Sequence, residues 1–322
     1  MRRQLIGLTV SAVLVTASAC GSSNSSDSAG DTAADGTTTV KVGIIPILDV
    51  APVYLGQKKG FYEKRGLKLE LTPAQGGAAI VPGVLNNEFQ FGFSNTTSLL
   101  VAQSKKVPVK VVANGVASTA EEGADFMGTT VKKGSPIKSP KQLEGKKVAV
   151  NSLNNICDTS IKESVRKDGG DASKLKFVEM PFDQMPAALE GNQVDAACTP
   201  EPALSTVKEA GGTAIAASFY DVDPNLTVAM YFTSQQYAKQ NPELVKKFQE
   251  ATAESLEYAD SHPDEVREIV ATYTKIPPTL LEKLTLPHWP AEPNRASIER
   301  LAELAKQDGQ LKEDPDLDAL LP

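Results

Sequence analysis

Two stretches of the chain follow the same plan, and this repetition constrains the fold more than any other feature of the sequence. Residues 40–97 and 147–204 each run from a strand through a polar loop to a helix, a second strand and a second helix, and then to a third strand that begins at an acidic or polar position. Strands that alternate with helices are typical of sheets built from strand–helix–strand units. We therefore expect two similar α/β lobes, each built on a parallel sheet.

Short apolar runs predict ten strands, with helices in the gaps between them. The predicted strands are 40–46, 67–72, 89–94, 109–114, 127–132, 147–151, 176–180, 194–198, 213–217 and 227–232. The clearest predicted helices are 52–64, 79–86, 158–168, 183–190 and 201–210. The pattern changes after Tyr231, and residues 241–322 are predicted to be helical, with prolines marking the breaks. We expect this tail to pack on one lobe.

The first residues have the composition of an export signal. Two arginines precede an apolar run too short to span a bilayer, and small residues lead to Cys20. We predict a signal peptide over residues 1–19, cut before Cys20, whose thiol would then carry the lipid of a bacterial lipoprotein; ordinary signal cleavage is the alternative. Residues 20–39, rich in Gly, Ser, Asp, Thr and Ala, are predicted to be a flexible tether. The expected location is outside the cytoplasm, anchored to the cell membrane.

The charge and the length of the chain limit the classes of protein to which it can belong. The 33 basic and 40 acidic side chains give a net charge of −7, and loss of the two N-terminal arginines with the signal peptide would leave 31 against 40, or −9. Nucleic acid is not an expected partner, because it requires a clustered positive surface. No later apolar run approaches membrane-spanning length. The 283 residues after residue 39 exceed what one hydrophobic core usually organises, in agreement with two lobes.

In open α/β sheets, ligands bind beyond the carboxyl ends of the strands. That rule selects five polar loops, at residues 47–49, 75–77, 94–97, 151–155 and 199–201. Each also has a structural explanation, since a Gly-Gly pair can be a simple turn and Ser, Thr and Asn residues can cap helices. The candidate ligand-binding residues are Leu48, Asp49, Gln75, Gly76, Gly77, Ser94, Asn95, Thr96, Asn151, Asn154, Asn155 and Glu201.

The chemistry of these loops narrows the solute. They hold no Arg or Lys, so an anion would rely on hydroxyls and on backbone amides such as those of Gly76 and Gly77 at a helix start. Asp49 or Glu201 could instead neutralise an ammonium group, because a carboxylate buried by closure must be paired; the alternative for Glu201 is helix capping. Simple nitrate-like or doubly charged ligands are thus disfavoured. The aromatic residues that could form an apolar wall, or belong to the core, are Tyr54, Phe126, Phe182 and Trp289.

Two cysteines follow Cys20, and both lie near the predicted site. Cys157 comes just after the Asn-rich loop, and Cys198 just before Thr199. A disulfide between them would lock the loops of the second lobe, and two buried thiols are the alternative.

Five motifs stand in a fixed order along the chain. They are Val42–Pro46 with Ala51–Gly56 and Lys59–Leu67; Leu85–Gly92; Leu143–Val150; Gly191–Ala197 with Pro200–Pro202; and His262–Glu265. In this order they resemble the substrate-binding proteins of ABC importers in the nitrate, sulfonate, taurine and thiamine-pyrimidine-precursor group. The resemblance covers nearly the whole chain after residue 39.

The resemblance implies a two-lobed, periplasmic-binding-protein-like fold of the type II Venus-flytrap class, with two crossover strands and closure on a small molecule. We place one lobe at residues 40–130 with 225–322, and the other at 131–224. The implied function is delivery of a small organic solute to a membrane permease and its ATPase, by a monomer without cofactor or metal. The solute would be sulfonate- or taurine-like or another organic acid; a thiamine-pyrimidine precursor or an aromatic carboxylate is the alternative.

An enzyme is the rival class, either a secreted hydrolase or a pyrimidine-synthesising relative of similar fold. Catalysis needs a nucleophile or base with an orienting partner. The only histidines, His262 and His288, fall in the predicted helical tail, and no Gly-x-Ser-x-Gly or His-Glu-x-x-His motif occurs. We therefore expect a binding protein.

Overall fold

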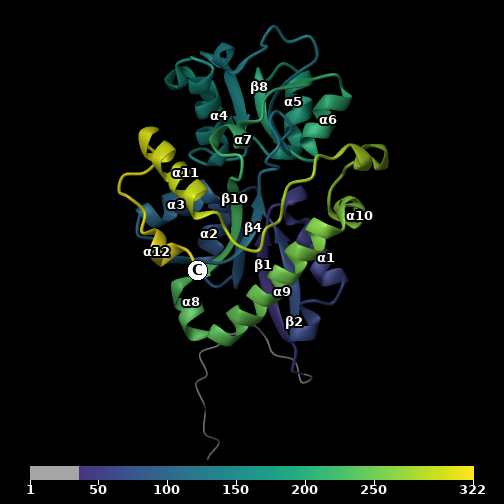
Figure 1. The fold of residues 1–322 in the computed structure, drawn as a ribbon, viewed down its shortest axis with the longest axis vertical. Helices are drawn as coiled ribbons and strands as arrows, with labels where there is room; N and C mark the ends of the chain where they lie inside the picture. Colours follow the sequence, from purple (N-terminus) through teal and green to yellow (C-terminus); the bar gives the residue numbers. More distant parts are fainter. Residues whose placement is uncertain (1–35) are drawn as a thin grey trace, which may run out of the picture.

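Ten strands form two sheets of five strands each in the computed structural model, which describes residues 36–322. The first sheet has the order β2–β1–β3–β10–β4, and the second has the equivalent order β7–β6–β8–β5–β9. The first contains β1 (Thr38–Ile44), β2 (Leu67–Pro73), β3 (Phe91–Asn95), β4 (Val109–Ala117) and β10 (Thr227–Ser234). The second contains β5 (Met127–Val131), β6 (Lys147–Val150), β7 (Lys176–Glu179), β8 (Ala196–Pro200) and β9 (Thr213–Ala216). We call the regions around them the first lobe and the second lobe, which stand one above the other in Figure 1.

Each sheet contains one strand that runs against the other four. In the first sheet β10 is antiparallel to β3 and β4, and in the second β5 is antiparallel to β8 and β9. The prediction of wholly parallel sheets is therefore wrong at these two strands. The physical reason is that β5 and β10 enter from the opposite lobe rather than through a strand–helix–strand unit, so their direction is reversed. They are the two crossover strands that the family resemblance implies, and the fold class is confirmed.

Helices cover both sheets at the positions that the apolar spacing indicates. The first lobe contains α1 (Ala51–Lys58), α2 (Gly77–Leu85), α3 (Thr96–Ser104), α8 (Gln235–Gln240), α9 (Pro242–Ser261), α10 (Pro263–Tyr273), α11 (Arg295–Gln307) and α12 (Leu317–Leu320). The second contains α4 (Ile156–Lys167), α5 (Met185–Glu190), α6 (Ala203–Glu209) and α7 (Ser218–Val222). The helix predicted over 52–64 ends at Lys58, because Gly60 turns the chain with a positive φ of 76°.

The helical tail packs on the first lobe, as expected, and also reaches the second. Within the first lobe, the ring of Phe248 on α9 stacks on Phe91 of β3 with centroids 3.9 Å apart. Toward the second lobe, Arg300 of α11 pairs with Glu163 of α4 at 2.9 Å. Figure 1 shows the segment after α10 running between the two lobes before it returns to α11. The tail therefore belongs to the interface between the lobes as well as to the first lobe.

The chain first crosses between the lobes before the predicted boundary at residue 131. The predicted start of the second lobe at residue 131 falls inside β5, which already pairs with β8, so the crossover lies between Ala117 and Met127. β1 begins at Thr38, so the last two residues of the predicted tether are part of a strand. The signal peptide, Cys20 and the rest of the tether lie outside the described residues. No helix within residues 36–322 is long and apolar enough to span a membrane.

Candidate functional site

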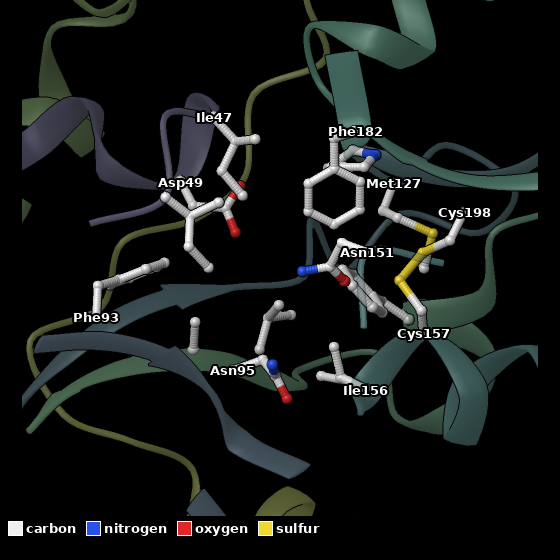
Figure 2. Close-up of a pocket in the computed structure, with 15 residues that line it drawn as sticks. Ile47, Asp49, Phe93, Asn95, Met127, Asn151, Ile156, Cys157, Phe182 and Cys198 are labelled. Carbon is white, nitrogen blue, oxygen red and sulfur yellow. A yellow bond between two sulfur atoms is a disulfide. The ribbon is translucent and has the colours of Figure 1, made fainter. Parts of the chain in front are cut away.

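Loops at the carboxyl ends of the strands meet between the two lobes and enclose a small space, which we call the inner cavity (Figure 2). Its volume of about 30 Å³ has room for about two water molecules. Both lobes and the crossover strands form its walls. The lining residues are Ile45, Ile47, Asp49, Phe93, Asn95, Met127, Asn151, Ile156, Cys157, Phe182, Cys198, Pro200, Phe219, Val228 and Ala229.

Asp49 is the acidic side chain that faces this cavity. It lies in a short 3-10 helix (Leu48–Val50), and the indole N–H of Trp289 donates to its backbone oxygen at 3.2 Å. Only 3% of the residue is exposed, and the carboxyl Oδ1 has no hydrogen-bond partner among residues 36–322. Burial raises the pKa of Asp49 to about 7, and the nearby Asp125 adds to the shift. An unpaired buried carboxyl of this kind is ready to accept hydrogen bonds from a donor that enters the cavity.

Asn151 faces Asp49 from the second lobe, as Figure 2 shows. Its Nδ2 donates to the backbone oxygen of Gln75 at 3.2 Å, and Gln75 Nε2 donates to the backbone oxygen of Asn151 at 2.9 Å. A Cβ at Gly76 would lie 2.8 Å from Asn151 Nδ2, so glycine permits this close approach. The exchange joins the first lobe to the second beside the cavity.

The Ser94–Thr97 cluster contributes one cavity residue, Asn95, and it also caps α3. Asn95 Oδ1 accepts from the backbone N–H of Ser98 at 2.9 Å. The hydroxyl of Thr96 donates to the backbone oxygen of Thr227 at 2.7 Å, on a crossover strand. A Cβ at Gly77 would come within 1.9 Å of Ser94 Oγ, so Ser94 packs closely against the start of α2. Helix capping and packing, the alternatives considered from the sequence, account for these contacts.

The Asn-rich loop of the second lobe also contains one cavity residue and one helix-capping residue. Asn155 is buried, accepts from the backbone N–H of Cys157 at 2.9 Å to cap α4, and donates to Asn151 Oδ1 at 2.6 Å. Asn154 is exposed, with a positive φ of 57°. Of this loop only Asn151 lines the inner cavity, and Asn155 orients it.

Glu201 is fully buried, but its carboxylate has partners of its own. Oε1 accepts from the hydroxyl of Ser205 at 2.8 Å and from the backbone N–H of Thr285 at 3.1 Å, and Oε2 accepts from the backbone N–H of Ser205 at 3.0 Å. Burial raises the pKa of Glu201, and these donors oppose the rise. The side chain does not line the inner cavity. The geometry supports the structural role considered from the sequence: Glu201 caps α6 and ties the tail to the second lobe.

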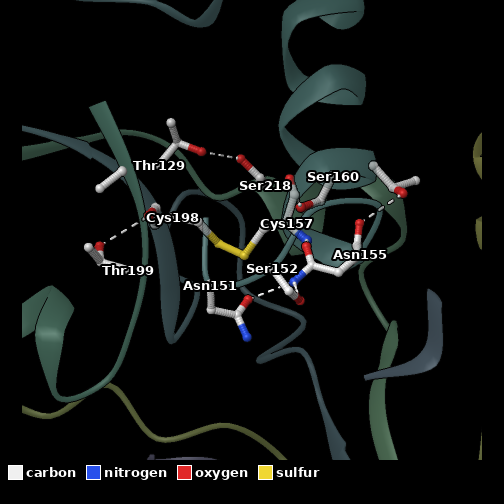
Figure 3. The surroundings of a disulfide bond; sticks show 12 residues. Thr129, Asn151, Ser152, Asn155, Cys157, Ser160, Cys198, Thr199 and Ser218 are labelled. Carbon is white, nitrogen blue, oxygen red and sulfur yellow. Dashed lines mark hydrogen bonds between the residues drawn. A yellow bond between two sulfur atoms is a disulfide. The ribbon is translucent and has the colours of Figure 1, made fainter. Parts of the chain in front are cut away.

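Cys157 and Cys198 form a disulfide with an S–S distance of 2.00 Å. It joins the first turn of α4 to β8 (Figure 3). Both cysteines line the inner cavity. Hydroxyl pairs lie nearby, including Thr129 with Ser218 at 2.7 Å. The disulfide is a covalent link between two cavity walls that are 41 residues apart in sequence, and it therefore restricts their relative movement.

A larger hollow adjoins the inner cavity and opens outward between the lobes; we call it the outer groove. Its volume is about 630 Å³, and it shares Ile45, Ile47, Phe182 and Pro200 with the inner cavity. Its walls are largely apolar, with charge in three lining side chains. The charged residues are Asp183, Glu190 and Lys275, and the prolines are Pro46, Pro181, Pro186, Pro200, Pro202 and Pro277.

Sequence reasoning found part of this site. Leu48, Asp49, Gln75, Asn95 and Asn151 lie at or beside the two spaces. Phe182 is the one aromatic candidate that lines them, since Trp289 and Phe126 are buried in the core and Tyr54 stacks on Tyr273 at 3.9 Å. The cavity residues Phe93, Met127, Ile156 and Phe219 were missed, because nothing in the sequence separates a cavity wall from a core position.

Comparison with known proteins places the chain among binding proteins. Residues 48–266 match the family described as NMT1/THI5 like, which is more than half of the chain. The chain belongs to the NMT1/THI5-like family. One relative of this NMT1/THI5-like protein is the putative binding protein BAB2_1146 of Brucella abortus. The two are 24% identical over 71% of this chain and 69% of that protein. The taurine-binding periplasmic protein of Escherichia coli is 22% identical over 63% of this chain and 61% of its own length.

Solved structures agree on the fold of this NMT1/THI5-like protein. The alkanesulfonate-binding protein SsuA of Xanthomonas axonopodis pv. citri matches with a TM-score of 0.74 at 16% identity, over 88% of this chain and 98% of that one. At this identity the likeness establishes the two-lobed fold alone. Together with the family match, it confirms the resemblance that the five motifs indicated.

Two features often found in catalytic sites are a cluster of metal ligands and a histidine. Residues 36–322 contain no group of three or more His, Cys, Asp or Glu side chains that could hold a metal ion. His262 lies in the tail between α9 and α10, and His288 lies 3.3 Å from Asp260, a residue of α9. Neither histidine lines the inner cavity or the outer groove.

Proposed function

We propose that this protein is the solute-binding component of an ABC importer, an extracytoplasmic lipoprotein that captures a small organic solute between its lobes and delivers it to a membrane permease. Membership of the NMT1/THI5-like family and the binding proteins among its relatives support this reading. The observation that carries it is the inner cavity, which is walled by both lobes and holds an unpaired buried carboxyl.

Capture would work by closure. A solute that contacts both lobes binds the closed form more tightly than the open one, and only that difference can shift the balance between them. The structure has contacts that must break on opening, such as the Gln75–Asn151 exchange and the hydrogen bond from Leu48 N to Glu201 O at 3.2 Å. A solute would add its own contacts to these. The permease would then recognise the closed shape.

The lining of the inner cavity favours a solute with a hydrogen-bond donor. None of the described residues that line it is Arg, Lys or His, while the Oδ1 of Asp49 has no hydrogen-bond partner among them. A taurine-like zwitterion, whose ammonium group could meet Asp49, fits better than a simple anion. An aminopyrimidine is the second candidate, because its exocyclic amine is also a donor that Asp49 can accept. A sulfonate or carboxylate without an amino group would bring no hydrogen-bond donor to Asp49.

Calorimetry combined with small-angle X-ray scattering tests the proposal. The purified protein is unfolded and refolded to remove carried-over solute, and then titrated with taurine, alkylammonium ions, aminopyrimidines, alkanesulfonates and nitrate. We expect saturable binding of at least one donor-bearing compound, together with a fall in the radius of gyration as the lobes close. Binding without any change in shape, or no binding across the panel, would contradict capture by closure.

A further inference from the structure

The two adjoining spaces differ sharply in size. The inner cavity, at about 30 Å³, has room for about two water molecules, which is enough for a small head group and no more. The outer groove, at about 630 Å³, lies within the range typical of pockets for organic ligands. The spaces share Ile45, Ile47, Phe182 and Pro200, so they adjoin at these side chains, and a molecule in the groove lies next to the cavity.

The two spaces also differ in chemistry. The inner cavity offers the carboxyl of Asp49, whose Oδ1 has no hydrogen-bond partner among the described residues. The groove is walled by prolines, whose rings hold the backbone rigid, together with Phe182 and Tyr273. Tyr273 is fixed in place, since its hydroxyl donates to the backbone oxygen of Ile47 at 3.1 Å and its ring stacks on Tyr54. A rigid apolar wall favours a flat apolar group, because little conformational freedom is lost on binding.

The groove is also built from both lobes. Residues 181–187 and 200–210 form its wall on the second lobe, and residues 45–47 and 273–277 form the wall on the first. Lys275 and Asp183 face each other across this mouth at 4.0 Å. A group that fills the groove would therefore contact both lobes and favour their closed arrangement.

We infer that the solute is an elongated molecule with a positively charged amino head group at Asp49 and a flat apolar body in the outer groove. This inference rests on the proposed function and goes beyond it by assigning the groove as a second subsite. The body would supply much of the affinity, since burial of a phenyl-sized group is expected to strengthen binding by about 100-fold.

Three probes separate head group from body. 2-Phenylethylammonium carries both, ethylammonium lacks the body, and 2-phenylethanesulfonate has the same body with the opposite charge. Calorimetry on the purified protein should give binding of 2-phenylethylammonium about 100-fold tighter than that of ethylammonium, and no binding of the sulfonate. Equal affinity for the two ammonium ions would overturn the groove subsite and leave the proposed function standing. Binding of the sulfonate instead would overturn the charge of the head group.

A blocking variant tests the location. Ala187 is exposed on α5 and lines the groove, so Ala187→Trp should fill the subsite without disturbing the core. Ala296→Trp, at an exposed position on α11, is the matched control. Ala187→Trp should weaken 2-phenylethylammonium to near the affinity of ethylammonium and leave ethylammonium unchanged, while Ala296→Trp changes neither. Full affinity in Ala187→Trp, or failure of every probe to bind wild type, would overturn the inference; the wider panel then decides the proposed function separately.

Discussion

Two buried acids sit on loops that touch between the lobes, and their surroundings are opposite. Glu201 has three hydrogen-bond donors around its carboxylate, whereas Asp49 Oδ1 has no partner among the described residues. The loops are joined by the hydrogen bond from Leu48 N to Glu201 O. The difference teaches that burial alone does not mark a binding residue. The acid whose partners are already supplied holds the fold together, and the acid left unpaired is available to a ligand.

The largest expected effect is on the pH dependence of stability at Asp49. Its folded-state pKa of about 7 exceeds its ordinary value of 3.8, so the folded state holds a proton that the unfolded state has lost. The contribution of Asp49 to the free energy of unfolding is therefore full below pH 4. It falls as the pH rises to about 7, by about 1.4 kcal/mol per pH unit and up to about 4 kcal/mol in all.

Asp49→Asn should remove this loss. We expect the free energy of unfolding at pH 8 to rise by up to about 4 kcal/mol, with no gain at pH 4. Urea denaturation of the wild type and the variant at both pH values measures the difference. An equal change at the two pH values would show that Asp49 is not a buried, strained acid.

Glu201→Ala should act in the opposite direction. The substitution leaves two backbone N–H groups and the Ser205 hydroxyl without their acceptor, which should cost about 3 kcal/mol of unfolding free energy. Urea denaturation gives the value, with Glu209→Ala, an exposed acid at the end of α6, as a control expected to change stability by less than about 0.5 kcal/mol. The same small change in both variants would mean that the contacts of Glu201 do not stabilise the fold.

Solute affinity should distinguish Asp49 from an acid on the exposed rim of the groove. Asp49→Asn removes the charge that would pair with an ammonium head group in a buried cavity, so we expect affinity for 2-phenylethylammonium to fall about 100-fold. Asp183→Asn, on the exposed rim of the groove, should change it by less than about threefold. Calorimetry near neutral pH measures both. A comparable loss in the two variants would point to general electrostatic attraction rather than to direct contact at Asp49.

The smallest effect concerns the contact that joins the lobes. Gln75→Ala removes a hydrogen bond to the backbone of Asn151 at a partly exposed position, so the closed form should lose about 1 kcal/mol and solute affinity should fall about fivefold. Gln103→Ala removes a comparable bond to Asp316 within the first lobe, and affinity should stay unchanged. If both variants bind like the wild type, the Gln75–Asn151 exchange does not help to hold the lobes closed.

Much of the fold was predictable, since apolar spacing placed all ten strands within a few residues. What the pattern did not contain was the direction of β5 and β10. Strand direction depends on which lobe the chain has just left, and a run of apolar residues such as Thr227–Ser234 reads the same in either direction.

The site was predictable where it follows a local rule. Asp49, Asn95 and Asn151 come directly from the preference for the carboxyl ends of strands. Glu201 met the same rule, and only the folded positions of Ser205 and Thr285 distinguish it from Asp49. The outer groove was missed, because part of its wall comes from residues 273–277, which no local pattern connects to β1.

The central claim, that Asp49 is the unpaired acid that receives the solute, is tested most directly by counting the protons released on binding. Asp49 lies near Asp125, Tyr231 and Tyr273, and with a pKa of about 7 it should be largely protonated at pH 6. An ammonium head group would require the ionised form. Calorimetric titration of 2-phenylethylammonium at pH 6, in two buffers of different ionisation enthalpy, should therefore show release of about one proton by the wild type. Asp158, whose pKa is also raised to about 7, is present in both proteins, so proton release from Asp158 would persist in Asp49→Asn, whereas release from Asp49 would be absent from that variant. Binding by the wild type without proton release, or the same release in Asp49→Asn, would contradict the account.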